Sequence, residues 1–129
     1  MNIDLTVQEV KDFLVSNTFE YKATQTKLSF PILFRIYKKL KIGVKFSEIK
    51  IGEKLIIDGH HRYLASILAK VEIATLPSHR VTATKLIEWC DIEIDSEDWD
   101  REEKEIKRFN EIDAKNSNLS LEELIQLLK

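Results

Sequence analysis

The sequence predicts an α+β domain, with a small mixed sheet, helices packed on it and a helical extension at the C-terminal end. Several segments repeat apolar residues with the helical period, and short apolar runs between them have the composition of strands. Near residue 58 a strand-like run joins a helix-like run directly. A chain of 129 residues, 43% of them hydrophobic, has the size of one domain and can bury a core without disulfides.

Two helices are predicted in the first 43 residues. Thr6-Val7-Gln8-Glu9 has the form of a capping box and predicts a helix over residues 7–16. Ser29-Phe30-Pro31 supplies an N-cap serine and a first-turn proline for the second helix, and Gly43 marks its end. The polar residues 17–27 between them predict a short strand or an extended loop.

The sheet is predicted from the middle of the chain. Residues 44–51 and 55–57 form a predicted hairpin, and residues 63–70 follow as a helix buried against it. A third strand over 73–76 ends at a proline. Residues 86–94 predict a further strand, although the apolar spacing at its start also fits a helix, and Cys90 is expected in the core.

The last third of the chain predicts two helices. Negative charge at a helix N-terminus is favourable, so the acidic run after Ser96 predicts a helix to about Ala114. A second capping box at Ser120 opens a short apolar helix that needs a partner surface, either a second copy or another protein. We therefore divide the chain into a domain over residues 1–95 and an acidic helical extension over 96–129 packed on it. The expected buried face of the first of these helices contains Trp99, Ile106, Phe109 and Ile112.

Charge is distributed unevenly along the chain. Residues 1–90 hold 14 Lys and Arg against 9 Asp and Glu, a net +5, whereas residues 91–129 hold 6 against 13, a net −7. The basic part would attract phosphate or nucleic acid, and the acidic part would cover it or form solvated helix faces. One basic helix end, open to either interpretation, contains Lys38, Lys39, Lys41 and Lys45.

The cellular compartment is predicted from three features: the single cysteine, the lack of a recognisable signal peptide and the lack of a long apolar run. Cys90 is the only cysteine, which excludes an internal disulfide and a cysteine-rich zinc site and fits a reducing compartment. No signal peptide precedes the first predicted helix, and no apolar run approaches the ~18 residues of a membrane span. We expect a cytoplasmic protein with no membrane partner.

The stretch Asp58-Gly59-His60-His61-Arg62 has the chemistry of an anion-binding turn. It joins the strand-like run to the helix-like run, so its residues occupy a helix N-terminus, where backbone N–H groups lack partners and the helix dipole is positive. Gly59 lets the backbone approach a ligand or adopt positive φ, and Arg62 can grip phosphate oxygens with two parallel bonds. Phosphate is therefore the first ligand to consider.

Residues 56–65, which contain this turn, resemble the signature of the ParB/sulfiredoxin superfamily, in particular its ParB-like domains with an Asp-Gly-His-His-Arg core. Ala23-Thr24-Gln25 is similar to a Thr-Gln element of these domains, and residues 41–49 resemble the helix, glycine and strand before the signature. The resemblance covers residues 20–80 and implies a ParB/sulfiredoxin-like fold.

Departures from the family narrow what the resemblance implies. His60 stands where sulfiredoxins carry a cysteine, so their repair chemistry is not expected. Segregation proteins have a Glu-Arg-Arg type motif and a following helix-turn-helix domain, and neither is evident here. The pattern is most similar to the bacterial toxin-associated domains and the serine-kinase branch. The resemblance then implies a nucleoside triphosphate, ATP or CTP, with or without Mg²⁺.

Roles for individual residues follow from the turn and from the resemblance. His60 and His61 could serve as general acid or base, and Asp58 could activate a hydroxyl, bind Mg²⁺ or simply form the N-cap of the helix. Adjacent helical histidines are about 100° apart, and no acidic or histidine partner stands at ligand spacing, so no protein metal site is expected. By the resemblance, the nucleotide-binding residues are Thr24, Gln25, Gly59, His60, His61 and Arg62.

Three functions are compatible with this pattern. The first is nucleotide-dependent phosphotransfer or hydrolysis at the Asp58–Arg62 turn. The second is a ParB-like nuclease, hydrolysing DNA or RNA with His60 or His61 as acid or base, although the acidic tail and a net charge of −2 oppose nucleic-acid binding. The third is a non-enzymatic interaction module that docks through the last helix.

Overall fold

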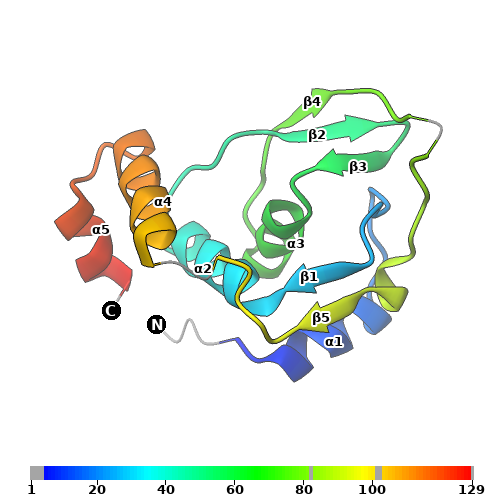
Figure 1. Ribbon diagram of the computed structural model, residues 1–129, viewed down its shortest axis with the longest axis horizontal. Coiled ribbons are helices and arrows are strands. Elements are labelled where there is room, and N and C mark those ends of the chain that lie inside the picture. The colour runs from blue at the N-terminus through cyan, green and yellow to red at the C-terminus, as the bar shows by residue number, and fades with distance from the viewer. Residues whose placement is uncertain (1–4, 82, 101–102, 129) are drawn as a thin grey trace.

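The computed structural model describes residues 5–81, 83–100 and 103–128, and it confirms the α+β class (Figure 1). The described residues form five α-helices and two small sheets. In chain order the elements are α1 (Val7–Ser16), β1 (Lys27–Ser29), α2 (Phe30–Lys41), β2 (Ile49–Gly52), β3 (Leu55–Asp58), α3 (His60–Ala69), β4 (Thr75–Pro77), the 3-10 helix η1 (Trp89–Asp91), β5 (Glu93–Asp95), α4 (Glu103–Asn116) and α5 (Leu121–Leu128).

The strands form one mixed sheet and one parallel pair. The three-stranded sheet has the order β3-β2-β4, in which β2 is antiparallel to β3 and parallel to β4. The second sheet pairs β1 with β5 in parallel, with Leu28 opposite Ile94. The antiparallel pairing of β2 and β3 confirms the predicted hairpin.

Helix α3 lies between the two sheets, where its apolar stripe is covered from both sides (Figure 1). Tyr63, Leu64, Ala65 and Ala69 of this helix are buried in the main core. Small alanines on α3 allow close packing, and α2 packs directly against it. The α3 N-terminus is thereby held in a fixed position. The other buried residues of this core are Val10, Leu14, Ala23, Leu28, Leu33, Tyr37, Leu40, Ile49, Ile56, Trp89, Ile92 and Ile94.

The predicted helix starts of α1 and α5 are confirmed by their capping boxes. In α1 the Glu9 N–H donates to Thr6 Oγ1 and the Thr6 N–H donates to Glu9 Oε1, both at 3.1 Å. Ser120 and Glu123 make the same reciprocal pair before α5. Ser29 is the N-cap of α2 as expected, but its hydroxyl donates to the Glu97 carbonyl at 2.9 Å and makes no cap bond.

Three predicted strands are wrong in extent. The strand predicted over residues 73–76 is β4, Thr75–Pro77, which begins two residues later and includes the proline. Residues 44–48 are a loop, because the N–H of Val44 turns back to the Lys39 carbonyl and the N–H of Lys45 donates to Ser117 Oγ, so neither is available to a ladder. The segment 86–94 contains a single bridge at Ile87, then η1, and only then β5.

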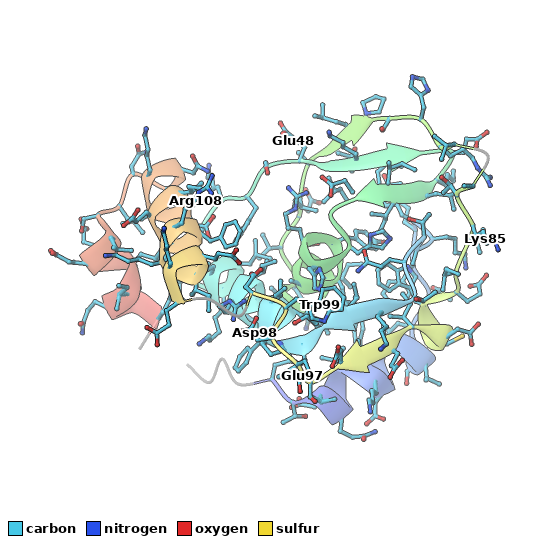
Figure 2. The ribbon with its side chains drawn as sticks, in the orientation of Figure 1. Glu48, Lys85, Glu97, Asp98, Trp99 and Arg108 are labelled. Carbon is cyan, nitrogen blue, oxygen red and sulfur yellow. The ribbon has the colours of Figure 1, made fainter. Side chains whose placement is uncertain are left out.

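The start and the buried face of α4 also differ from the prediction. Residues 96–100 form a loop, and the described part of α4 begins at Glu103. Of the expected apolar face, Phe109 and Ile112 are 46% and 43% exposed, whereas Asp113 and Ala114 are buried. The loop is held by Arg35, and Glu97, Asp98 and Trp99 gather on it (Figure 2).

The helices α4 and α5 pack on the rest of the chain through a second, smaller core. Val44, Ala114 and Leu124 are its buried members. A buried ion pair adjoins it, with Lys39 Nζ 2.7 Å from Asp113 Oδ2. Lys39 is therefore not part of a solvated basic helix end.

The exposure of Cys90 and the length of the described helices bear on two further predictions. Cys90 is exposed on η1, so its expected place in the core is wrong, whereas its neighbour Trp89 is buried. None of the described helices is long and apolar enough to cross a membrane.

Candidate functional site

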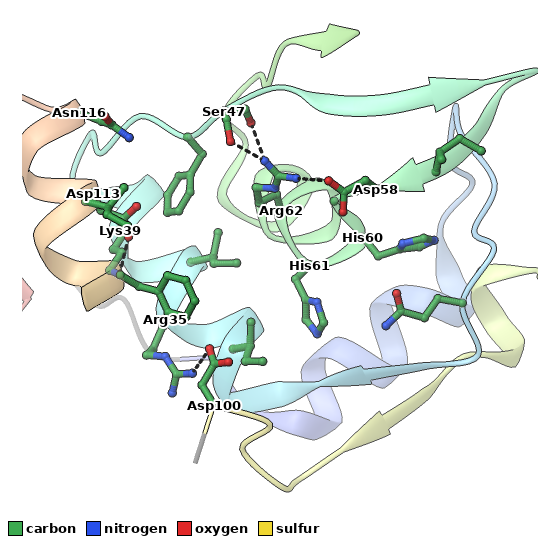
Figure 3. A pocket seen from close by; sticks show the side chains of 18 residues that line it. Arg35, Lys39, Ser47, Asp58, His60, His61, Arg62, Asp100, Asp113 and Asn116 are labelled. Atoms are coloured by element: carbon green, nitrogen blue, oxygen red, sulfur yellow. Dashed lines mark hydrogen bonds and ion pairs between the residues drawn. The ribbon is translucent and has the colours of Figure 1, made fainter. Parts of the chain in front are cut away.

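A cavity of about 490 Å³ lies between the first turn of α3 and the helices α2 and α4 (Figure 3). The predicted turn, Asp58–Arg62, lines it together with Gln25. Thr24 does not line it. The volume falls within the usual range for small-molecule sites. The structure thus brings all but one of the predicted site residues to one cavity.

The turn itself requires glycine at position 59 for two reasons. Gly59 has φ of +103°, a left-handed conformation that side chains disfavour. A Cβ there would also lie 2.5 Å from Ile49 Cγ2 of the neighbouring strand. Gly59 is the N-cap residue of α3, so the interpretation of Asp58 as the N-cap is wrong: Asp58 ends β3.

Among the described residues, no side chain caps the start of α3. The first intrahelical bond at this end runs from the Tyr63 N–H to the Gly59 carbonyl at 2.8 Å. The N–H groups of the first turn precede that bond and carry the positive end of the helix dipole. They belong to His60, His61 and Arg62, all of which line the cavity.

Arg62 is held by the loop that leads into β2. Its Nη1 donates to the Ser47 hydroxyl at 2.7 Å, the Ser47 carbonyl at 3.1 Å and the Glu48 carbonyl at 3.3 Å. Its Nη2 donates to Asp58 Oδ2 at 3.3 Å. The guanidinium is thereby fixed at the cavity wall, while the Asp58 side chain remains 65% exposed.

His60 is a buried acceptor. Its Nε2 accepts the Thr24 N–H at 2.9 Å, which places the ring proton on Nδ1. Burial lowers the pKa of His60 to about 4, although the Asp58 carboxylate acts in the opposite direction. The ring is therefore neutral at neutral pH, and general acid or base chemistry at Nε2 would require this bond to break.

His61 has the same arrangement with a different partner. Its Nε2 accepts the Ser29 N–H at 2.9 Å, and its ring meets the Trp99 ring edge to face at 5.3 Å between centroids. Burial, and then the neighbouring His60, lower the pKa of His61 to about 4. Both histidines thus join the start of α3 to other segments.

Thr24 and Gln25 occupy different positions relative to the cavity. The Thr24 hydroxyl donates to the Ile56 carbonyl at 2.6 Å, so this residue connects its loop to β3 and His60. Gln25 lines the cavity, and its Nε2 donates to the Lys27 carbonyl at 2.7 Å. Its Oε1 makes no hydrogen bond within the described part of the chain, and Gln25 is the one of the two that can reach a ligand.

Two cations from α2 also line the cavity, and neither is among the site residues predicted from the sequence. Arg35 and Lys39 stand four residues apart, on the face that also carries Ile32 and Ile36. The sequence signal was two basic side chains spaced within an otherwise apolar helical face. Their acidic partners come from the loop before α4 and from α4 itself, and sequence gives no register for such a contact.

Part of the wall is apolar, and α4 supplies some of its residues. Helix α4 contributes Phe109 and Ile112, whose exposure is thereby explained: they face the cavity. Three carboxylates also line it, but no group of three or more His, Cys, Asp or Glu side chains in the described ranges could hold a metal ion. The other apolar lining residues are Ile32, Ile36, Phe46 and Ile57.

Comparison with known proteins adds no identification. No family model, no curated protein and no solved structure matches this chain.

Proposed function

We propose that this chain binds a nucleoside phosphate in the cavity, with a phosphate at the first turn of α3. The observation that carries the proposal is that α3 begins at Gly59 without a capping side chain and opens into a cavity that also has an apolar wall. Backbone N–H groups favour the anion, and an apolar wall suits a base. The resemblance of residues 56–65 to ParB-like domains supports the same ligand class.

The residues of the first turn and Gln25 would each contact a different part of the nucleotide. The Arg62 guanidinium is already oriented by the 47–48 loop, so little side-chain entropy is lost when it meets a phosphate oxygen. His60 and His61 would each keep their backbone bond at Nε2 and offer the proton on Nδ1. Gln25 would contact the ribose or the base.

Phosphotransfer or hydrolysis with ATP or CTP, with or without Mg²⁺, is the catalytic form of this proposal. Asp58 is its best candidate for a base, because its carboxylate is exposed and, among the described side chains, pairs with Arg62 alone. It could accept the proton of an attacking hydroxyl or hold Mg²⁺ against the phosphates.

Calorimetric titration with nucleotides tests the proposal. We expect binding at millimolar concentration or tighter, and we expect Arg62→Lys to weaken it about tenfold, because lysine lacks the planar fork. Arg108→Lys is the matched control, since Arg108 is an exposed arginine of α4 outside the cavity (Figure 2). Circular dichroism checks that both variants fold. No binding of any nucleotide, or equal binding by the two variants, contradicts the proposal.

The nuclease function and the docking function have less support than nucleotide binding. Each described cation that lines the cavity is paired with a carboxylate, and this pairing disfavours binding of a nucleic-acid backbone. Incubation with plasmid and total RNA, with divalent metals, tests that prediction. Docking through α5, as a homodimer or with another protein, is a prediction based on Ile125 and Leu127, which are 38% and 48% exposed, and solution mass tests it.

A further inference from the structure

The cations that line the cavity are already neutralised by the protein. Lys39 lies 2.7 Å from Asp113, and both side chains are almost entirely buried, at 5% and 13% exposure. Arg62 pairs with Asp58 at 3.3 Å. These two paired cations therefore attract an incoming anion much less strongly than two isolated positive charges would.

Arg35 is held more firmly still. It makes two parallel bonds to Asp98, at 2.6 and 2.9 Å, and a third bond to Asp100 at 3.2 Å. The paired arginine and carboxylates are only 24% to 31% exposed. The hydrogen bond from Arg35 lowers the pKa of Asp98, so this carboxylate stays ionised at neutral pH.

The described residues that line the cavity therefore carry no excess of positive charge. They include three cations and three carboxylates, both histidines are neutral, and Asp98, paired with Arg35, adds a further negative charge. Each phosphoryl group of a ligand adds about one to two negative charges. A triphosphate would have to displace carboxylates from their cations, and a displaced Asp100 or Asp113, at 24% and 13% exposure, would be left partly buried and unpaired.

The site can hold one anionic group without displacing any of these carboxylates from its cation. The first turn of α3 supplies N–H donors that no described carboxylate caps, and these form one compact group. The wall also has an apolar part, which includes Phe109 and Ile112 and suits the flat face of a base.

We propose that the cavity takes a nucleotide with a single phosphate, a nucleoside monophosphate, in preference to the triphosphate, with its base against Phe109 and Ile112 of α4. The inference rests on the proposed nucleotide site and narrows it. The acidic extension then sets the selectivity: through Asp100 and Asp113 it neutralises the cations of α2, and it supplies one face of the base pocket.

A phosphate series tests this directly. One nucleoside is titrated by calorimetry with no, one, two and three phosphates, with and without Mg²⁺. The monophosphate is expected to bind about tenfold or more tightly than both the nucleoside and the triphosphate. A triphosphate that binds as tightly as the monophosphate, in either condition, overturns the inference and leaves the proposed function standing. Absence of binding across the whole series overturns both.

A charge variant tests the cause of the preference. Asp100→Asn removes one carboxylate from the cavity, while Asp98 still holds Arg35 with two bonds. The preference for monophosphate over triphosphate should fall about threefold or more. Glu111→Gln removes the same charge from an exposed position of α4 outside the cavity and should leave the preference unchanged. Equal preferences in these two variants would refute the charge argument.

A matched pair of isoleucines tests where the base lies. Ile112 of α4 lines the cavity, and Ile125 of α5 lies outside it, at similar exposures of 43% and 38%. Ile112→Ala should weaken monophosphate binding about threefold to tenfold, because the base loses apolar contact, and Ile125→Ala should not. Binding that is unchanged in Ile112→Ala contradicts the placement of the base.

Discussion

The imidazole of His61 accepts a hydrogen bond from the backbone N–H of Ser29 at 2.9 Å, which ties the first turn of α3 to the residue where β1 ends and α2 begins. The Ser29 hydroxyl reaches in turn to the Glu97 carbonyl, and Trp99 packs against the His61 ring. Three segments far apart in sequence therefore meet at the candidate site, and a neutral His61 is needed for this arrangement.

The first prediction concerns pH. Burial lowers the pKa of His60 and His61 from 6.5 to about 4 in the folded chain. As pH falls below 6.5 the unfolded chain takes up protons that the folded chain does not, so the free energy of unfolding decreases between 6.5 and about 4. The contribution is fully present above 6.5, and its complete loss amounts to about 3 kcal/mol per ring. Urea unfolding at a series of pH values measures it.

Single variants distinguish the contribution of the histidines to this pH dependence from that of the carboxylates, which also titrate in acid. Glutamine can replace Nε2 as an acceptor without taking up a proton, so His61→Gln should flatten the pH dependence in this window. His79→Gln changes an exposed histidine of the loop after β4 and should leave the slope as in the wild type. A His60→Gln and His61→Gln double variant with the wild-type slope would refute this explanation.

A second prediction compares two glycines with similar φ. Gly59→Ala should lower the free energy of unfolding by about 3 kcal/mol or more, because it combines left-handed strain with a contact to Ile49 that the core cannot relieve. Gly43 has φ of +92° but nothing within 4 Å of its Cβ position, so Gly43→Ala should cost only about 1 to 2 kcal/mol. Denaturant unfolding gives both values. Equal costs would mean that Ile49 can move aside.

A third prediction concerns the ion pair between α2 and α4. Lys39→Met leaves the buried Asp113 carboxylate without its cation and should cost about 3 to 5 kcal/mol. Adding Asp113→Leu should recover most of that loss, since no charge is then left unpaired. Lys22→Met serves as the control, because its pair with Glu88 is exposed and should contribute less than about 1 kcal/mol. A double variant as unstable as Lys39→Met alone would argue against this interpretation.

A fourth prediction follows from the exposure of Cys90. The thiol should react with a chromogenic disulfide reagent in native buffer, with a rate within about tenfold of that in denaturant, because no unfolding is needed to reach it. The reaction is followed by absorbance, and Cys90→Ser gives the blank. A reaction that appears only in denaturant would place the thiol in the core after all.

The sequence was most informative where the signal is local. Capping boxes at Thr6 and Ser120, the proline at the start of α2 and the glycine between β3 and α3 each determine a boundary through nearby atoms, and these boundaries were confirmed. The Asp58–Arg62 turn belongs to this class: its residues are consecutive in the chain, and all five of them line the cavity.

The errors came from contacts between distant segments. The apolar residues of α4 were assigned to a core by periodicity, but Phe109 and Ile112 face the cavity because Asp113 is drawn to Lys39 on α2. Helical periodicity identifies the apolar face of a helix and not what lies opposite it. The same limit hid the acceptor roles of His60 and His61, whose donors are backbone N–H groups more than thirty residues away.

The parallel pairing of β1 with β5 has a consequence for the order in which the chain assembles. Residues 27–29 have no strand partner until residues 93–95 are available, so this ladder closes a long loop before it gains any bond. During synthesis, the first ninety residues would leave the ribosome with one edge of the core uncovered. Completion of the hydrophobic core therefore waits for Ile94, and a fragment that stops short of Glu93 should remain partly open and prone to aggregation.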